Sequence, residues 1–197
     1  MKQVNVWMIA GALLAIAAQP VAAQTATTKA SGLNYTYADT AVRLSDYDGP
    51  DGTGLGAVFS YDLGSVPRFR LLGGVSYDDI DSPLDSAFNL LIGAGYIHPL
   101  VAKTDLVADL AILHSSVDAG PVDDSDTGYR LSAYVRHEVQ AGFQIEGGLN
   151  FVDIFDDSEL GLNLGGYYNI TKAVALMARY DQEGQVDVFS LGARFNF

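Results

Sequence analysis

The sequence contains no cysteine and few basic residues. Its 197 residues include 11 Lys and Arg against 24 Asp and Glu, which gives a formal net charge of −13. The absence of cysteine excludes disulfides and any zinc or iron–sulfur site built on thiolates. Nucleic acid is excluded as a partner of so acidic a chain, because phosphate binding requires clustered Lys and Arg. With 49% hydrophobic and 18% charged residues, the chain is too apolar for a disordered acidic segment.

Long hydrophobic runs are also missing, apart from one near the N-terminus. Lys2 precedes an apolar run of 13 residues, 6–18, and Pro20 follows it. The run is shorter than the roughly 20 residues that a membrane-spanning helix needs. A basic start, an apolar middle and small residues at the exit are typical of an export signal. The sequence therefore predicts a signal peptide over residues 1–23, cleaved after Ala23.

Side chains in the rest of the chain alternate between apolar and polar with a period of two. In 143–151, every second position carries Phe, Ile, Gly, Leu and Phe, whereas the positions between carry Gln, Glu, Gly and Asn. Segments 69–77 and 129–135 show the same pattern. A strand places successive side chains on opposite faces, whereas a helix would leave no apolar face here. After a short flexible lead-in over residues 24–31, residues 32–197 are expected to form one all-β domain.

Ten alternating segments are expected. They are residues 33–45, 54–62, 68–78, 86–98, 105–116, 128–138, 143–153, 159–169, 173–181 and 186–197. Their lengths are near the 9–11 residues that a tilted strand needs to cross a bilayer, and exceed the 5–6 residues usual in soluble proteins. Longer acidic connections alternate with shorter ones, which predicts loops on one rim and short turns on the other. The expected fold is a closed antiparallel up-and-down transmembrane β-barrel of about ten strands, with eight strands as the alternative.

The aromatic and charged residues indicate that the apolar face contacts lipid rather than a soluble core. Aromatic residues lie near both ends of the segments and aliphatic residues fill the middle, as a bilayer with two interfaces requires. Charged residues take the opposite face, where an Arg avoids the roughly 2–4 kcal/mol that lipid contact at mid-depth costs. The side chains expected in the lumen are Arg68, Arg70, Asp109, Arg130, Arg136, Glu146, Arg179 and Arg194. The lumen is expected to be polar and largely plugged, with at best a narrow path for small solutes, because ten strands enclose little more space than the eight that side chains fill.

The first segment does not fit the alternation. Tyr35 and Tyr37 share one face, whereas Val42 and Leu44 share the other. A bulge over residues 38–41 would restore the alternation, or the strand leaves the membrane at that point. The sequence leaves both explanations open.

The end of the chain favours a closed barrel. Residues 189–197 alternate to the last position and finish on Phe197. A terminal strand leaves unpaired backbone groups in the bilayer unless it pairs with the first strand. Closure of the last strand on the first is therefore expected.

These patterns resemble the small outer-membrane β-barrel family of Gram-negative bacteria, the OmpA-like barrel or porin-family group. The resemblance lies in 32–37 (GLNYTY), 72–77 (LGGVSY), 93–98 (GAGYIH) and Phe197, and 93–108 is most similar to a branch from xanthomonads and related proteobacteria. It implies a place in the cell outer membrane among lipids and lipopolysaccharide, and recognition of the last strand by the barrel-insertion machinery. It implies no catalytic residue and no cofactor. The residues of the implied C-terminal insertion signal are Phe189, Leu191, Phe195 and Phe197.

The acidic connections contain 17 carboxylates, which include Asp78, Asp181 and Glu183 and are expected to form a solvated rim. Residues 123–126 (DDSD) could supply oxygen ligands to Ca²⁺, but the ligand spacing of an EF-hand loop is absent. Divalent ions that bridge this rim to lipopolysaccharide phosphates are a weaker hypothesis. The three histidines are scattered singly, so no metal site is expected.

One pair of residues suggests an enzyme as the alternative. His114 and Ser116 lie two residues apart on one strand face, which is similar to the His-x-Ser pair of outer-membrane lipid A deacylases. A serine nucleophile needs a nearby base and a third group that orients the base, and only Asp118 is placed for that role. The flanking residues differ from the deacylase motif. The sequence therefore favours a non-enzymatic envelope or surface protein, with a narrow porin or an adhesion factor as the candidate functions.

Overall fold

The structure is a computed structural model that describes residues 32–120 and 122–197. The predicted signal peptide (1–23) and lead-in (24–31) lie outside the described residues. The described chain forms ten strands, one for each segment predicted from the alternation. They are β1 (Tyr37–Asp46), β2 (Asp51–Asp62), β3 (Phe69–Ile80), β4 (Ser86–Val101), β5 (Thr104–Ala119), β6 (Val122–Gln140), β7 (Phe143–Ile154), β8 (Asp157–Asn169), β9 (Val174–Glu183) and β10 (Val186–Asn196).

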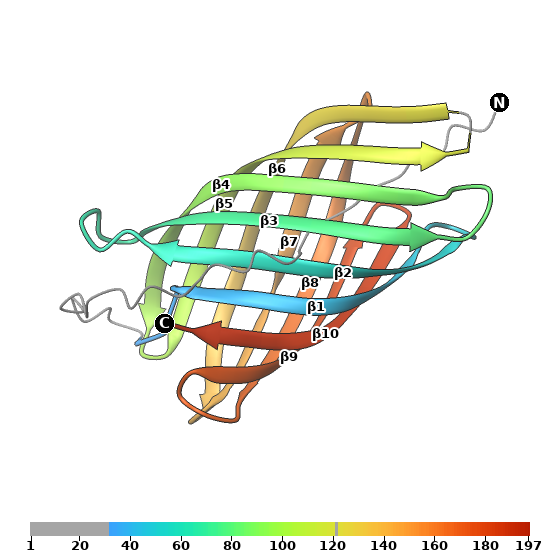
Figure 1. Cartoon of the computed structure of the whole chain (residues 1–197). Coiled ribbons are helices and arrows are strands. Elements are labelled where there is room, and N and C mark those ends of the chain that lie inside the picture. Colours follow the sequence, from blue (N-terminus) through green and yellow to red (C-terminus); the bar gives the residue numbers. More distant parts are fainter. Residues whose placement is uncertain (1–31, 121) are drawn as a thin grey trace.

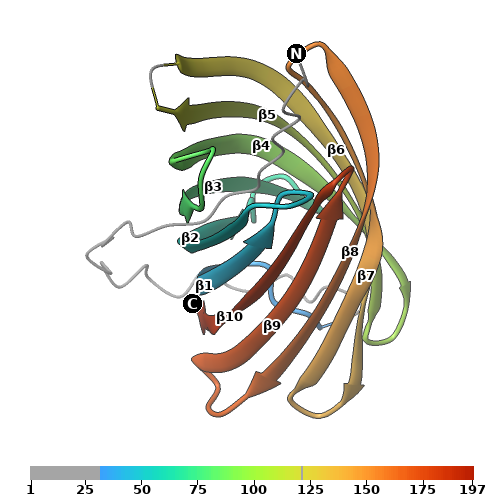
Figure 2. The same ribbon diagram turned by 90° about the vertical axis from the view of Figure 1, so that its right-hand side faces the viewer.

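The ten strands form one closed antiparallel barrel. Each strand pairs with its neighbours in sequence, and β1 pairs with both β2 and β10. Figures 1 and 2 show the strands following one another around the wall, with the end of β10 beside the start of β1. Within the described residues, no helix is long and apolar enough to cross a membrane. The ten-stranded up-and-down barrel is confirmed, and the alternative of eight strands is wrong.

β1 is a regular strand without a bulge. It pairs residue by residue with β10 and with β2 along its whole length. Tyr37, Asp39 and Arg43 are buried inside the barrel, whereas Val42 and Leu44 are 49% and 51% exposed on the outer wall. The bulge, one of the two explanations that the sequence left open, is therefore wrong. The tyrosine rings face inward because arginines inside the barrel stack on them, so aromatic character alone does not show which face meets lipid.

The two rims of the barrel differ in charge rather than in the length of their connections. The acidic rim holds the connections β1–β2, β3–β4, β5–β6, β7–β8 and β9–β10, which are two to five residues long. The turn rim holds the other four connections, of two to six residues, and both ends of the barrel sheet. Residues 117–127, which lie between the predicted segments 105–116 and 128–138, are mostly paired strand rather than loop. β5 and β6 stay in register up to Ala119 and Val122. The prediction of longer acidic loops is therefore wrong: the acidic residues lie mainly on extended strands, whose pairing satisfies the backbone groups.

The outer wall of the barrel is apolar. Every strand exposes large hydrophobic side chains, each at least 37% exposed. Aliphatic residues lie at mid-height, and include Leu71, Leu90, Ile92, Leu110, Leu131 and Leu176. Exposed aromatic residues flank them, with Phe69, Tyr96, Tyr168 and Phe195 toward the turn rim and Tyr77, Phe88, Tyr129 and Phe189 toward the acidic rim. An apolar band with an aromatic border on each side is typical of membrane barrels, and far exceeds the apolar patches of soluble monomers.

Candidate functional site

The interior of the barrel is closed near the acidic rim by a cluster of apolar side chains, here called the apolar cap. The residues of the apolar cap are Tyr47, Leu72, Ile80, Leu84, Ala87, Leu91, Ala111, Leu113, Val117, Val152, Ile154, Val186 and Val188. They come from β3, β4, β5 and β7, from β10 across the barrel, and from the β1–β2 and β3–β4 connections, which contribute Tyr47 and Leu84. Because these side chains form one contiguous buried cluster, opposite walls of the barrel meet there. The interior at this end is therefore partly apolar, and the buried carboxylates of Asp78 and Glu183 lie at the same height.

Tyr47 connects the apolar cap to the charged residues below it. It lies in the β1–β2 connection, and its hydroxyl donates to Oδ2 of Asp78 at 3.4 Å. Burial is the main cause that raises the pKa of the Tyr47 hydroxyl, and the negative charge of Asp78 adds to it. Arg43 binds the same carboxylate, with Nε 3.0 Å from Oδ1. Asp78 is fully buried, and the guanidinium compensates for the loss of its hydration.

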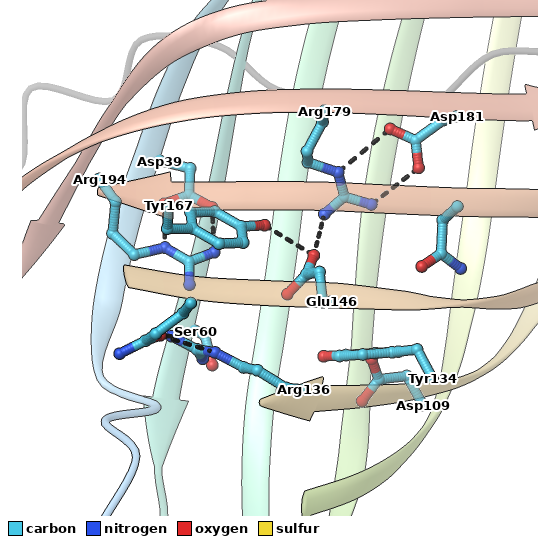
Figure 3. A network of polar contacts seen from close by, with 12 residues as sticks. Asp39, Ser60, Asp109, Tyr134, Arg136, Glu146, Tyr167, Arg179, Asp181 and Arg194 are labelled. Carbon is cyan, nitrogen blue, oxygen red and sulfur yellow. Dashed lines mark hydrogen bonds and ion pairs between the residues drawn. The ribbon is translucent and has the colours of Figure 1, made fainter. Parts of the chain in front are cut away.

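A network of arginine–carboxylate pairs fills the middle of the lumen. Arg179 on β9 is its central member: Nε and Nη2 donate to Asp181 at 3.1 and 2.7 Å, and Nη1 donates to Glu146 on β7 at 3.2 Å. The hydroxyl of Tyr167 on β8 donates to the same oxygen of Glu146 at 2.6 Å. Figure 3 shows Arg179 between the two carboxylates, with the Tyr167 ring beside them. The Glu146 carboxylate thereby joins three strands through side chains alone.

Five further contacts join other strands across the interior. Each pairs an arginine with a carboxylate, and their side chains are buried or nearly so. They are Arg43–Asp78, Arg70–Asp109, Arg130–Asp181, Arg130–Glu183 and Arg194–Asp39. Among the described residues, these contacts and those of Arg179 bring five arginines and six carboxylates into the lumen. Arg136 also lies in the lumen, and so does Asp105, which accepts a hydrogen bond from the Tyr35 hydroxyl at 3.0 Å. The interior is therefore close to electrically neutral.

Stacked arginine and tyrosine side chains fill the lumen toward the turn rim. The guanidinium of Arg194 lies 3.6 Å from the ring centre of Tyr37 and 3.8 Å from that of Tyr167. Arg136 lies 5.0 Å from the ring centre of Tyr35 and donates to Oε1 of Gln144 at 2.6 and 3.1 Å. Cation–π contacts gain strength when they are shielded from water. Flat side chains packed face to face leave little room for a solute path.

A small central cavity remains between the cap and the stacked residues. Its volume is about 110 Å³, and Arg70, Arg130, Arg179 and Asp109 lie in its wall together with the lower face of the apolar cap. Small-molecule sites usually enclose roughly 300–1,000 Å³. The cavity is large enough for a few water molecules among the charged groups, but too small for a sugar or a nucleotide.

The structure places most of the predicted lumen residues inside the barrel. Buried inward-facing side chains are Arg70, Arg130, Arg136, Glu146 and Arg194, and partly buried ones are Asp109 and Arg179. Arg68 differs from the expectation. It precedes β3, has a φ of +72° in the β2–β3 connection, and is exposed on the outside of the barrel. The alternation does not extend to it, because the strand begins only at Phe69.

Sequence reasoning missed several residues of the network. Asp39 and Arg43 lie on the strand whose facing was ambiguous, and Asp78, Asp181 and Glu183 were assigned to the solvated rim. The alternation itself contained the missing signal for Asp78. It has the same parity as the inward-facing residues of β3, and it is fully buried.

The deacylase-like residues lie on the outer wall near the acidic rim. Nδ1 of His114 is hydrogen-bonded to Oγ1 of Thr127 at 2.9 Å, and Asp118 accepts a bond from Oγ of Ser86 at 3.1 Å. Among the described residues, no hydrogen bond joins His114 to Ser116 or to Asp118. The three groups are therefore not arranged as nucleophile, base and orienting acid. In the same part of the chain, no group of three or more His, Asp or Glu side chains is placed to hold a metal ion.

Comparison with known proteins supports the fold. No protein-family model matches the sequence, and no curated protein matches it. The β domain of the Bordetella autotransporter BrkA is similar in structure, with a TM-score of 0.50 and 15% identity over 83% of this chain and 99% of that chain. The KdgM porin has a TM-score of 0.48 and 13% identity over 81% and 99%, and Neisserial surface protein A a TM-score of 0.38 and 18% identity over 83% and 96%. With its apolar outer wall, the chain has the fold of a transmembrane β-barrel.

Proposed function

We propose that the protein is an integral outer-membrane β-barrel of the small OmpA-like or porin-family group, and that it acts as a non-enzymatic envelope protein with a closed lumen. The apolar wall supports insertion in a membrane, because burial of this wall in lipid removes it from water. The single observation that carries the closed lumen is the apolar cap, which joins opposite walls of the barrel.

The apolar cap opposes a porin function. An ion that passes through it would lose its hydration without gaining polar partners, which costs several kcal/mol even after relaxation. Channels that conduct replace the lost water with carbonyls or charged rings. Here the charged groups, which include Asp78, Asp181 and Glu183 at the height of the cap, are already paired with arginines.

The ion-pair network also resists opening. Removal of one partner of a buried pair costs about 3–5 kcal/mol, because the other charge is left without compensation. A path wide enough for a solute would have to separate several of these pairs at once. The network is thus better suited to stiffen the barrel than to conduct.

The acidic rim is the part of the protein that a surface role would use. Strands β5 and β6 continue past the aromatic side chains and carry Asp118, Asp123 and Asp124, which are exposed. Adhesion through this rim is a function compatible with its position, and it requires no solute path.

Conductance of the purified, folded protein in planar bilayers tests the closed lumen. Folding is checked by the change of gel mobility on heating, which an intact barrel shows and an unfolded chain does not. We expect a flat trace at applied voltage. Stepwise conductance from protein that passes the mobility check would overturn the closed lumen and favour the narrow porin. Membrane fractionation of expressing cells tests the location separately, and recovery outside the outer-membrane fraction would contradict it.

A further inference from the structure

Outside the lumen, positive and negative side chains occupy opposite rims. Among the described residues, the Lys and Arg side chains that do not face inward are Arg68, Lys103 and Lys172, and all three lie in connections of the turn rim. The connections of the acidic rim contain no Lys or Arg within the same part of the chain. An anionic surface is therefore attracted to the turn rim and repelled by the acidic rim.

The apolar wall extends to the connections of the turn rim. Each of its four connections has a large apolar side chain in it or beside it, and these side chains are between 48% and 65% exposed. They are Val66, Leu100, Val101, Val139 and Ile170. Lipid that covers the wall therefore extends to the connections themselves. This places the basic residues of the turn rim at the depth of the lipid head groups.

Arg68 is held against the outer wall at this depth. Its carbonyl accepts a hydrogen bond from the backbone N–H of Ile97 at 2.7 Å, which ties the β2–β3 connection to β4. Its Nη1 donates to the hydroxyl of Tyr96 at 3.3 Å, and the Tyr96 ring packs edge-on against Phe69 with 5.2 Å between ring centres. His98 also stacks against Tyr96, with 6.4 Å between ring centres. The guanidinium is thus positioned on an aromatic platform that faces outward.

Arg68 has no carboxylate partner within the described residues. Lys103, by contrast, forms an ion pair with Glu138, in which Nζ lies 3.2 Å from Oε2. The six inward-facing arginines are all engaged by carboxylates, tyrosine rings or amide oxygens of the interior. Arg68 therefore keeps most of its donors free toward the lipid. A guanidinium binds a phosphate through two parallel N–H···O bonds, which neither a lysine nor a histidine can do.

We propose that Arg68 on the Tyr96 platform binds the phosphate group of a phospholipid, whose acyl chains lie along the apolar wall above it. The inference rests on the proposed function, since it needs the barrel to be inserted in a membrane. The phospholipid is the one in the leaflet that meets the turn rim. Lipopolysaccharide is disfavoured as the occupant, because both ends of the barrel sheet lie at the turn rim, which in outer-membrane barrels of even strand number is the periplasmic side, whereas lipopolysaccharide occupies the opposite leaflet.

Native mass spectrometry of the folded barrel in a neutral detergent, with added phosphatidylglycerol, tests this site. The wild-type protein is expected to retain one phosphatidylglycerol molecule, and the variant Arg68→Gln to bind it about tenfold more weakly, as loss of a charge-assisted hydrogen bond implies. Lys172→Gln is the matched control: it removes one exposed positive charge from the same rim and should retain the lipid. Arg68 is exposed in a connection, so the variant should show the normal heat-dependent gel mobility.

Two further probes separate the sources of binding. A diacylglycerol of the same acyl chains carries no phosphate and should be retained poorly. Equal retention of diacylglycerol and phosphatidylglycerol, or equal loss in Arg68→Gln and Lys172→Gln, would overturn the phosphate site. Stronger Arg68-dependent retention of lipid A than of phosphatidylglycerol would overturn the choice of phospholipid. The proposed function is tested by different measurements, namely membrane fractionation and conductance. A failure of the lipid site can therefore be distinguished from a failure of the proposed function.

Discussion

Arg194 and Asp39 form an ion pair across the seam at which the barrel closes. Nε and Nη2 of Arg194 on β10 each lie 2.7 Å from a different oxygen of the Asp39 carboxylate on β1. The two residues are directly opposite each other in the β1–β10 register, although 155 positions separate them in the chain. Both side chains are buried. The first and last strands are therefore joined by charged side chains as well as by the backbone ladder.

Asp39→Asn should weaken the closed barrel. The substitution keeps the shape of the side chain but leaves the buried Arg194 charge uncompensated, so we expect a loss of about 3–5 kcal/mol in the free energy of unfolding. Urea unfolding in lipid vesicles, followed by heat-dependent gel mobility, measures it. Glu138→Gln is the control, because its pair with the exposed Lys103 should contribute at most about 1 kcal/mol. Equal midpoints for the two variants would show that the seam pair does not stabilise the barrel.

Adjacent positions on β5 test which face meets lipid. Leu110 is 57% exposed on the outer wall, so Leu110→Arg should impair insertion by roughly 2–4 kcal/mol. Ala111, the next residue, lines the lumen cavity and carries no charge, so Ala111→Ser should still insert. The fraction of protein with the folded gel mobility after mixing with vesicles reports both. Similar insertion of the two variants would contradict the facing.

The last residue should act in assembly more than in stability. The Phe197 side chain is 68% exposed, while its backbone N–H donates to the carbonyl of Thr36 at 3.1 Å. Phe197→Ala keeps this backbone bond, so we expect slower insertion in cells but unchanged folding into vesicles. Ile170→Ala removes a similarly exposed side chain outside the last strand and serves as the control. Equal insertion rates in cells would contradict a C-terminal signal.

Lipid A should keep its acyl chains when the protein is expressed. His114 is bonded to Thr127 and Asp118 to Ser86, and within residues 32–120 and 122–197 no hydrogen bond joins Ser116 to His114, the base that a serine nucleophile would need. Mass spectra of lipid A from expressing cells and from cells with an empty vector are expected to be the same. A loss of one acyl chain that Ser116→Ala abolishes would support the deacylase instead.

Processing of the N-terminus stays a prediction from the sequence. N-terminal sequencing of the membrane-inserted protein should begin at Gln24, because small residues precede that position. Ala23→Leu should retain the leader, since a large side chain does not fit the cleavage site of such signals. An unprocessed wild-type chain would show that the N-terminal segment serves another purpose.

The alternation of side chains was enough to predict the barrel. Because a strand turns successive side chains to opposite faces, the pattern in 143–151 located β7 and assigned its outward and inward residues without any knowledge of neighbours. The same local rule located all ten strands. The predicted strand ends differ from the observed ones mainly at the acidic rim. There the pairing between β5 and β6 outweighs the low strand propensity of Asp and Ser, so both strands are longer than predicted.

The contents of the lumen depended on the tertiary structure. Tyr37 faces inward because Arg194, from the other end of the chain, stacks on its ring, and no local pattern contains that contact. The apolar cap could not be predicted from the sequence either. Leu113 and Val152 lie on the inward faces of their strands, but only closure of the barrel brings them together with Val186. Sequence periodicity therefore determined the strands and the lipid-facing wall, since both follow from the direction of a side chain on its own strand. Closure of the lumen was decided by contacts between strands far apart in the chain.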